Sequence, residues 1–304
     1  MIAELLIQCG LAIWLVGAIV CLCLSHHPAL ARRTGCTAAL AGSLVELAGA
    51  AGALILGGVA PFALPFGNPL FSWTVRVDPL AAYFILILAI LSSAVALYSF
   101  GYLRPMENRR NLGAFGFFFN LILLSLALVF SAANAFFFLI AWEVMALSAF
   151  CLVSFEHEKR EARHAGVLFL IMSHAGTGLL LIAFLMLASV SGSLDFSSFH
   201  LLASTMSPTQ QGVVFLLFLF GFGVKAGIIP IHIWLPEAHP VAPSNVSALM
   251  SGIVIKSGIY GMARVFFDFY GGLPPWAGML VLTIGVVSAL IGGVAFNRRD
   301  LQAE

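Results

Sequence analysis

The amino-acid sequence predicts an all-α, polytopic membrane protein with about nine transmembrane helices. Hydrophobic residues make up 61% of its 304 residues and charged residues only 9%, whereas a soluble domain carries roughly a quarter of charged residues. The net charge of +1 also argues against a nucleic-acid-binding protein. The sequence contains nine apolar runs that reach the length of about 20 residues needed to cross a bilayer.

These runs define the expected helices in chain order. They cover residues 2–24, 36–59, 79–102, 112–131, 134–155, 165–190, 212–229, 243–267 and 275–296. Between the second and third runs, turn-forming residues favour a loop over strands, namely Gly57, Gly58, Pro61, Pro65, Gly67, Asn68 and Pro69. Residues 195–203 predict a short interfacial helix, with an apolar side made of Leu194, Phe196, Phe199, Leu201 and Leu202.

The basic residues predict the orientation of these spans. The loops after the first, third, fifth and ninth runs hold ten of them, namely Arg32, Arg33, Arg104, Arg109, Arg110, Lys159, Arg160, Arg163, Arg298 and Arg299. Only Arg76 and Arg264 lie at the opposite end. The positive-inside rule therefore predicts a cell (inner) membrane protein whose N-terminus is periplasmic and whose last residues are cytoplasmic. The first run carries Glu4 and no basic residue before it, which favours an anchor over a signal peptide.

Three ionisable residues lie deep inside apolar runs, where a charge is costly and therefore a functional candidate. Glu143 is nine residues into the fifth span, Lys225 about two-thirds along the seventh, and Lys256 thirteen residues past Pro243 in the eighth. A buried lysine and a carboxylate can switch between charged and neutral states as a proton passes. We expect a proton relay at these residues. A static ion pair and lysines that extend to the interface remain the alternatives.

Pro230 predicts a break in the seventh span, close to Lys225. Proline has no N–H, so the carbonyl of Ala226 loses its helical donor. Glycines around the lysine leave room for water or for close helix contact, at Gly221, Gly223 and Gly227. Broken helices at membrane depth are tolerated where they line a cavity, which is consistent with a relay site here.

Other ionisable groups have two readings each. His174, in the sixth span, is a candidate relay residue or an interhelical hydrogen-bonding group. Glu46, in the second span, is interpreted as a functional carboxyl or as a protonated, hydrogen-bonded one. His232, Glu237 and His239, between the seventh and eighth spans, are candidate proton-access residues or solvated groups. The charged residues at 156–163 predict a solvated cytoplasmic face.

No motif in the chain predicts a catalytic residue, a bound metal or a cofactor. The sequence lacks a Walker loop, a nucleophile elbow and a dinucleotide fingerprint. Its cysteines form no CxxC pair and have no histidine at zinc spacing, so they are interpreted as small apolar residues: Cys9, Cys21, Cys23, Cys36 and Cys151. We therefore expect redox chemistry to belong to a partner of this chain.

Four segments resemble one family of membrane proteins. They are GVKAGIIPIHIWLPEAHPVAPSNVSALMSGIVIKSGIYGMAR at 223–264, VDPLAAYF at 77–84, FFFLIAWEVMALSAF at 136–150 and HAGTG at 174–178. They are similar to the antiporter-like membrane subunits of respiratory complex I, multisubunit cation/proton antiporters and membrane-bound hydrogenases. The HPVAPSNVSALMSG segment and the FGFFFNLILLSLALVFSA run at 115–132 are most similar to the hydrogenase-4 component B and formate hydrogenlyase branch.

The resemblance implies a fold of about fourteen helices with two inverted five-helix repeats. This chain would contain three leading helices (1–111), the first repeat (112–267) and the first helix of the second repeat (268–304). It also implies that Glu143 and Lys225 form a charge pair, which Lys256 connects to the membrane axis. The family's next motif resembles residues 297–301, after which the chain ends at Glu304; the expectation is a chain truncated or split at its C-terminus.

The function implied by the resemblance is proton translocation in a redox-driven complex of the hydrogenase-4 or formate hydrogenlyase type. The chain would be a subunit of that oxidoreductase with no redox centre of its own. Its expected partners are the lipid bilayer, other membrane subunits and a peripheral arm of hydrogenase or dehydrogenase subunits, without nucleic acid. Two alternatives stay open: a subunit of a Na⁺(K⁺)/H⁺ antiporter or of complex I, and a truncated, non-pumping scaffold fragment.

Overall fold

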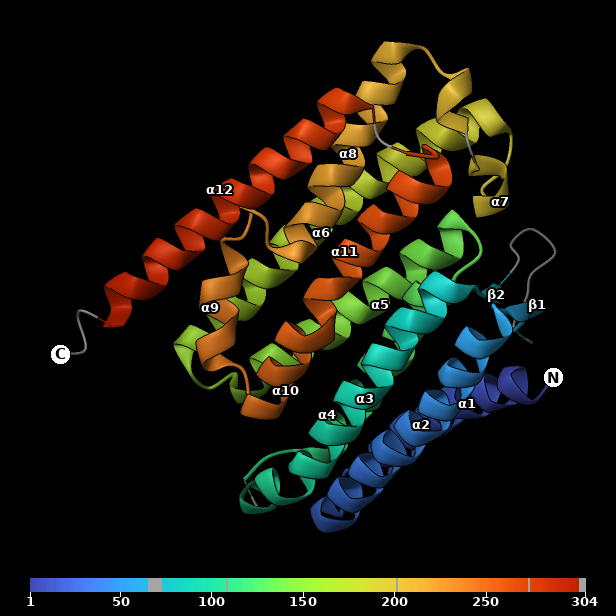
Figure 1. The fold of residues 1–304 in the computed structure, drawn as a ribbon. Coiled ribbons are helices and arrows are strands. Elements are labelled where there is room, and N and C mark those ends of the chain that lie inside the picture. The colour runs from blue at the N-terminus through green and yellow to red at the C-terminus, as the bar shows by residue number, and fades with distance from the viewer. Residues whose placement is uncertain (65–72, 108, 201, 273, 301–304) are drawn as a thin grey trace.

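The computed structural model describes residues 1–64, 73–107, 109–200, 202–272 and 274–300. Within these ranges, nine helices are long and apolar enough to cross a membrane, which confirms the predicted fold class. They lie side by side in one bundle, with α1 and α2 at one side and α12 at the other (Figure 1). α4 is the most enclosed, with 72% of its most apolar stretch buried, and α12 the least, with 6%.

The helices follow the apolar runs. Their bounds are α1 (Ile2–Cys23), α2 (Pro28–Leu56), α3 (Pro79–Tyr102), α4 (Leu112–Ser131), α5 (Ala135–Val153), α6 (Arg160–Ser191), α8 (Pro208–Ala226) and α12 (Pro275–Asp300). The eighth span is composite, with α10 (Ser244–Leu249), the π-helical η4 (Met250–Val254), α11 (Ile255–Arg264) and the π-helical η5 (Val265–Phe269). Side chains that accept a hydrogen bond from the first turn begin several helices, namely Asp78, Asn111, Asn134 and Ser207.

Three helices begin earlier than their apolar runs. α2 starts at Pro28, α6 at Arg160 and α8 at Pro208, so that each extends into residues predicted to be loop. Arg32 is therefore part of a helix, where it is 8% exposed. Its guanidinium donates to Glu107 and to the carbonyl of Phe100, both at 2.5 Å. Hydropathy did not mark the first turn of α2 because Arg32 is polar, although tertiary partners rather than water satisfy its guanidinium.

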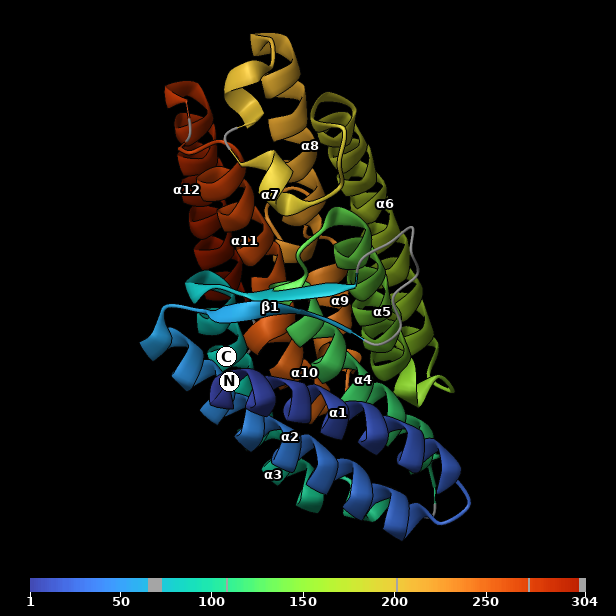
Figure 2. The ribbon, with the colours of Figure 1, turned by 90° about the vertical axis from the view of Figure 1, so that its right-hand side faces the viewer.

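The connection between α2 and α3 contains two strands, so the prediction of a loop without strands was wrong there. β1 (Val59–Ala63) and β2 (Thr74–Val77) pair in antiparallel fashion, and β2 crosses the bundle end in Figure 2. The pairing is irregular between Val59 and Phe62, where Pro61 has no N–H to donate. The predicted turn residues Pro65, Gly67, Asn68 and Pro69 lie outside the described residues.

The segment after α6 forms two short helical turns, so the prediction of one interfacial helix over 195–203 was wrong. They are α7 (Phe196–Phe199) and the 3₁₀ turn η3 (Leu202–Thr205). His200 leaves the helical conformation, with φ −59° and ψ 122°. The buried rings of Phe196 and Phe199 both stack on Phe184, which draws this segment onto the bundle. Leu201 lies outside the described residues.

Three further short elements connect the long helices. The 3₁₀ turns η1 (Arg104–Met106) and η2 (Ser154–Glu156) lie at one end of the bundle. The helix α9 (Trp234–Val241) lies between α8 and α10 and packs against α6. α8, which carries Lys225, packs against both α6 and α11, and α11 carries Lys256.

Candidate functional site

Lys225 lies in the last turn of α8 and is 1% exposed. The helix starts with a capping box between Ser207 and Gln210. It ends because Gly227 adopts the left-handed conformation, with φ 71°, where a side chain would be strained. These two ends place the lysine inside the protein at the point where the span stops.

The amine of Lys225 is held by α6 and by aromatic rings. Its Nζ donates to the Ser173 hydroxyl at 3.0 Å. It lies 4.5 Å from the ring centre of Phe169 and 5.7 Å from that of Trp142. Aromatic faces attract a cation, but they supply no full counter-charge. The lysine is thus buried with one hydrogen bond and two rings around it.

Glu143 contacts His174 rather than Lys225. The Glu143 Oε2 and His174 Nδ1 atoms are 3.1 Å apart, and the other carboxyl oxygen, Oε1, is buried without a hydrogen-bond partner among the described residues. No ion pair within 4.0 Å joins Glu143 to Lys225 in that part of the chain. Instead, consecutive residues of α6 contact the two groups, since Ser173 holds the lysine and His174 holds the carboxylate. The structure therefore brings three predicted site residues together through α6.

The helical conformation is interrupted after α8, as the sequence predicts for the seventh span. The helix ends at Ala226, three residues before the expected Ile229, and the Ile229–Pro230 peptide bond that follows is cis. The indole N–H of Trp234, in α9, donates to the carbonyl of Val224 at 2.7 Å. This carbonyl of the last turn, which also accepts from the Gly227 N–H at 3.4 Å, thus gains a side-chain hydrogen bond from beyond the break.

Lys256 and His239 converge on one residue that the sequence did not single out, Ser251. The Lys256 amine donates to the backbone carbonyl of Ser251. The Ser251 hydroxyl is 3.3 Å from both ring nitrogens of His239, and the Ser247 hydroxyl is 2.8 Å from Nδ1 of the same ring. Among the described residues no hydrogen bond or ion pair links Lys256 to Lys225.

An open cavity of about 470 Å³ lies between the α8–α9 connection and α12. Two predicted access residues, His232 and His239, line it, whereas Glu237 is exposed and does not. The His232 Nδ1 atom is buried without a hydrogen-bond partner in the described chain, so a water molecule in the cavity is its natural partner. Burial lowers the pKa of His239, which keeps this imidazole neutral at pH 7.

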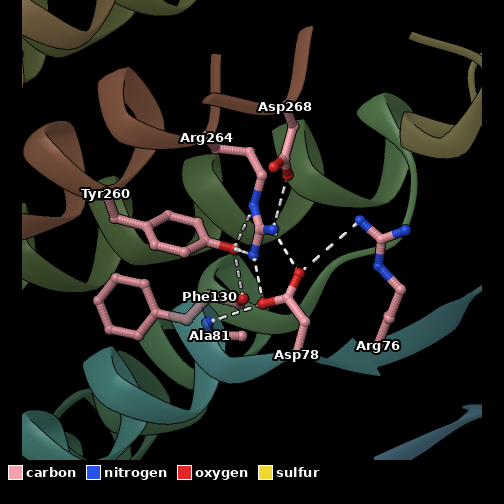
Figure 3. A network of polar contacts seen from close by, with 7 residues as sticks. All are labelled: Arg76, Asp78, Ala81, Phe130, Tyr260, Arg264 and Asp268. Carbon is pink, nitrogen blue, oxygen red and sulfur yellow. Dashed lines mark hydrogen bonds and ion pairs between the residues drawn. The ribbon is translucent and has the colours of Figure 1, made fainter. Parts of the chain in front are cut away.

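A buried charge network that the sequence analysis missed joins α3 to α11 and η5 (Figure 3). The Arg264 guanidinium donates to both carboxyl oxygens of Asp78 and, at 2.8 Å, to Asp268. It also donates to the Tyr260 hydroxyl, which itself donates to a carbonyl of α4 at 2.5 Å. Arg76 lies 3.9 Å from Asp78. Two sequence features could have indicated this network: the Asp-Pro helix start at residue 78, and the spacing of four residues between Arg264 and Asp268.

Glu46 is buried in α2, with no hydrogen-bond partner for either carboxyl oxygen among the described residues. It packs against Gly10 of α1, where an added Cβ would lie 2.6 Å from the Glu46 Oε1 atom. The expected hydrogen bond is therefore not observed. No group of three His, Cys, Asp or Glu residues in the described part of the chain is arranged to hold a metal ion.

Two family models match the sequence. The model described as "NADH:quinone oxidoreductase/Mrp antiporter, TM" matches residues 132–303, and "NADH-Ubiquinone oxidoreductase (complex I), chain 5 N-terminus" matches residues 64–112. The first match covers more than half of the chain.

Among curated proteins, hydrogenase-4 component B of Escherichia coli is 44% identical over 77% of this chain and 34% of its own length. Formate hydrogenlyase subunit 3 of Escherichia coli is 31% identical over 97% of this chain and 45% of its own length. The chain thus spans between about a third and a half of the length of these relatives.

Solved structures share the fold. A chain of an archaeal membrane-bound sulfane sulfur reductase superposes with a TM-score of 0.75 at 23% identity, covering 92% of this chain and 56% of that one. A chain of the Mrp complex from Dietzia sp. gives a TM-score of 0.71 at 20% identity, covering 86% of this chain and 49% of that one.

Proposed function

This chain belongs to the NADH:quinone oxidoreductase/Mrp antiporter family of membrane subunits, and from that premise we propose that it translocates protons in a redox-driven complex of the hydrogenase-4/formate hydrogenlyase type. The observation that carries this proposal is Lys225, a lysine that is 1% exposed in a membrane helix and has one hydrogen bond. Burial of an ammonium ion is costly without a counter-charge. The charge state of Lys225 therefore depends on its neighbours, as a relay requires.

The contacts on α6 supply a way to change that dependence. When His174 is protonated, its ion pair with Glu143 neutralises the carboxylate charge. When His174 is neutral, the carboxylate charge is left to act on Lys225, whose amine is bound by Ser173, the residue that precedes His174 in α6. Protonation of His174 thus changes the free energy of protonating Lys225, and the reverse. Lys225 would then release its proton toward Lys256 and the membrane axis.

Proton access is assigned to the cavity beside the break at Pro230. His232 and His239 line it, and Glu237 is an exposed residue of α9 outside its lining. In the proposed assembly, a peripheral hydrogenase or dehydrogenase arm provides the redox energy, and further membrane subunits continue the path. The chain is a multi-pass membrane protein; we assign it to the cell (inner) membrane, with its N-terminus periplasmic, on the distribution of its basic residues.

The test compares variants of the intact complex reconstituted in vesicles. Lys225→Met retains the apolar stem beside Phe169 and Trp142 but removes the amine, so we expect normal assembly and loss of redox-driven proton uptake. Ser93→Ala is the control, since the Ser93 hydroxyl only donates to a carbonyl one turn earlier in α3, and it should pump normally. Full proton uptake by Lys225→Met would sink the proposal and favour a scaffold role.

The same vesicles distinguish the antiporter alternative. With the redox substrate withheld, a Na⁺ or K⁺ gradient should drive no proton movement through a redox-driven subunit. Away from their ends, the described spans carry two carboxylates, Glu46 and Glu143, few for a site that must bind a dehydrated cation. Cation-driven proton flux without the redox reaction would replace the redox-driven reading with that of a cation/proton exchanger.

A further inference from the structure

Ser251 contacts two residues of the proposed proton path with two different groups. Its backbone carbonyl accepts a hydrogen bond from the Lys256 amine, and its hydroxyl lies 3.3 Å from the His239 ring nitrogens. Lys256 is in α11 and His239 is in α9. Ser251 is thus the residue through which the cavity-lining histidine and the membrane lysine are connected.

The π-helical segment explains how one residue reaches both. In a regular α-helix, residues 251 and 256 would point about 140° apart around the axis. Ser251 and Lys256 are instead joined through η4 (Met250–Val254), whose wider turn reduces that offset. The lysine side chain can therefore reach back to the carbonyl five residues earlier. Such single-turn π segments often occur at functional sites.

Two serine hydroxyls, one helical turn apart, contact the His239 ring. The Ser247 hydroxyl is 2.8 Å from its Nδ1 atom. The Ser251 hydroxyl, one turn later, is 3.3 Å from both Nδ1 and Nε2. A neutral imidazole has one donor and one acceptor nitrogen, and a hydroxyl can complement either. The ring also lines the cavity that contains His232, so water in the cavity can reach it.

From these contacts we propose that Ser251 is a positioning residue of the proton path. Its hydroxyl orients the His239 ring at the cavity, and its carbonyl holds the Lys256 amine on the other side. A proton that enters at the cavity thereby meets an oriented acceptor next to the membrane lysine. This inference rests on the proposed function, because it gives Ser251 a role only within that relay.

The test uses the intact complex in vesicles and two substitutions of Ser251. Ser251→Ala removes the hydroxyl and keeps the carbonyl, and we expect redox-driven proton uptake to fall about five- to tenfold, the equivalent of one lost hydrogen bond. Ser251→Thr keeps the hydroxyl, and we expect it to restore uptake to within about twofold of wild type. Ser93→Ala is the matched control in the same type of intrahelical serine.

The outcomes separate this inference from the proposed function. If Lys225→Met abolishes uptake while Ser251→Ala behaves like Ser93→Ala, the role of Ser251 is refuted and the relay stands. If Lys225→Met pumps normally, both fall. An equal loss in Ser251→Thr and Ser251→Ala also refutes the inference, because the hydroxyl is then not what matters. Unfolding temperatures in detergent, expected to be equal for both Ser251 variants, exclude a general loss of structure.

Discussion

Replacing Asp78 by alanine leaves the buried Arg264 guanidinium with one carboxylate instead of two. The Arg264 side chain is 7% exposed, so water cannot replace the lost partner. Asp268, at 2.8 Å, stays in place. Asp78 also caps α3, because its Oδ1 atom accepts a hydrogen bond from the Ala81 N–H at 2.9 Å. The substitution therefore removes both an ion pair and a helix cap.

The expected loss of stability follows from these two contributions. Removing one partner of a buried ion pair costs about 3–5 kcal/mol, and the remaining Asp268 puts Arg264 at the lower end of that range. Loss of the cap adds about 1 kcal/mol. We expect the free energy of unfolding to fall by about 4 kcal/mol in Asp78→Ala and by about 3 kcal/mol in Asp78→Asn, which retains the cap.

The assay is denaturant unfolding of the purified chain in detergent, with one double substitution and one control. Asp78→Ala combined with Arg264→Met removes both partners, so it should be more stable than Asp78→Ala alone. Glu158→Ala, which breaks the surface pair with Arg110, should have no measurable effect because Glu158 is 60% exposed. If Asp78→Ala and Glu158→Ala unfold at the same denaturant concentration, the reasoning about buried charge is refuted.

Three further predictions concern pH and packing. Burial raises the pKa of the Asp78 carboxyl, but the hydrogen bond and charge of Arg264 outweigh this effect and hold the pKa below its usual value. The stability that the Asp78 carboxylate provides should be present above about pH 4 and decline as the pH falls further. The decline should be smaller in Asp78→Asn. Gly258→Val should destabilise the chain by about 1–3 kcal/mol, because the new Cβ would lie 2.6 Å from a backbone oxygen of α8; Gly178→Val, with nothing within 4 Å, should unfold like wild type. Trp234→Phe loses the hydrogen bond to the last turn of α8 and should cost about 1 kcal/mol, whereas an unchanged unfolding midpoint would show that α9 does not support that turn.

The long helices were predictable because membrane insertion depends on a property summed over a segment. Any run of about 20 apolar residues reaches the required length whatever its tertiary contacts. The hairpin was not predictable in the same way, since Val59 pairs with Val77 across a segment whose glycines and prolines are equally typical of a loop. Nor does hydropathy reveal that Arg32 is buried, because this depends on meeting Glu107.

The candidate site was predictable only for its charged members. Lys225 and Lys256 stand out because a charge in an apolar run has a high cost. Serines in the same runs have no such cost, so neither Ser173 nor Ser251 could be distinguished from the other serines of the spans. The pairing of Glu143 with His174 depends on how α5 and α6 are rotated against each other. That rotation is a product of packing and has no signature in either helix alone.

The network around Arg264 has an electrical consequence. Its two arginines, Arg76 and Arg264, and its two aspartates, Asp78 and Asp268, sum to zero net charge. Moving one elementary charge across the membrane changes its energy by about 2.3 kcal/mol per 100 mV of membrane potential. For a neutral cluster that moves as a unit, the contributions of its positive and negative charges cancel. The end of the bundle held by these residues can therefore keep its position while the voltage across the membrane changes.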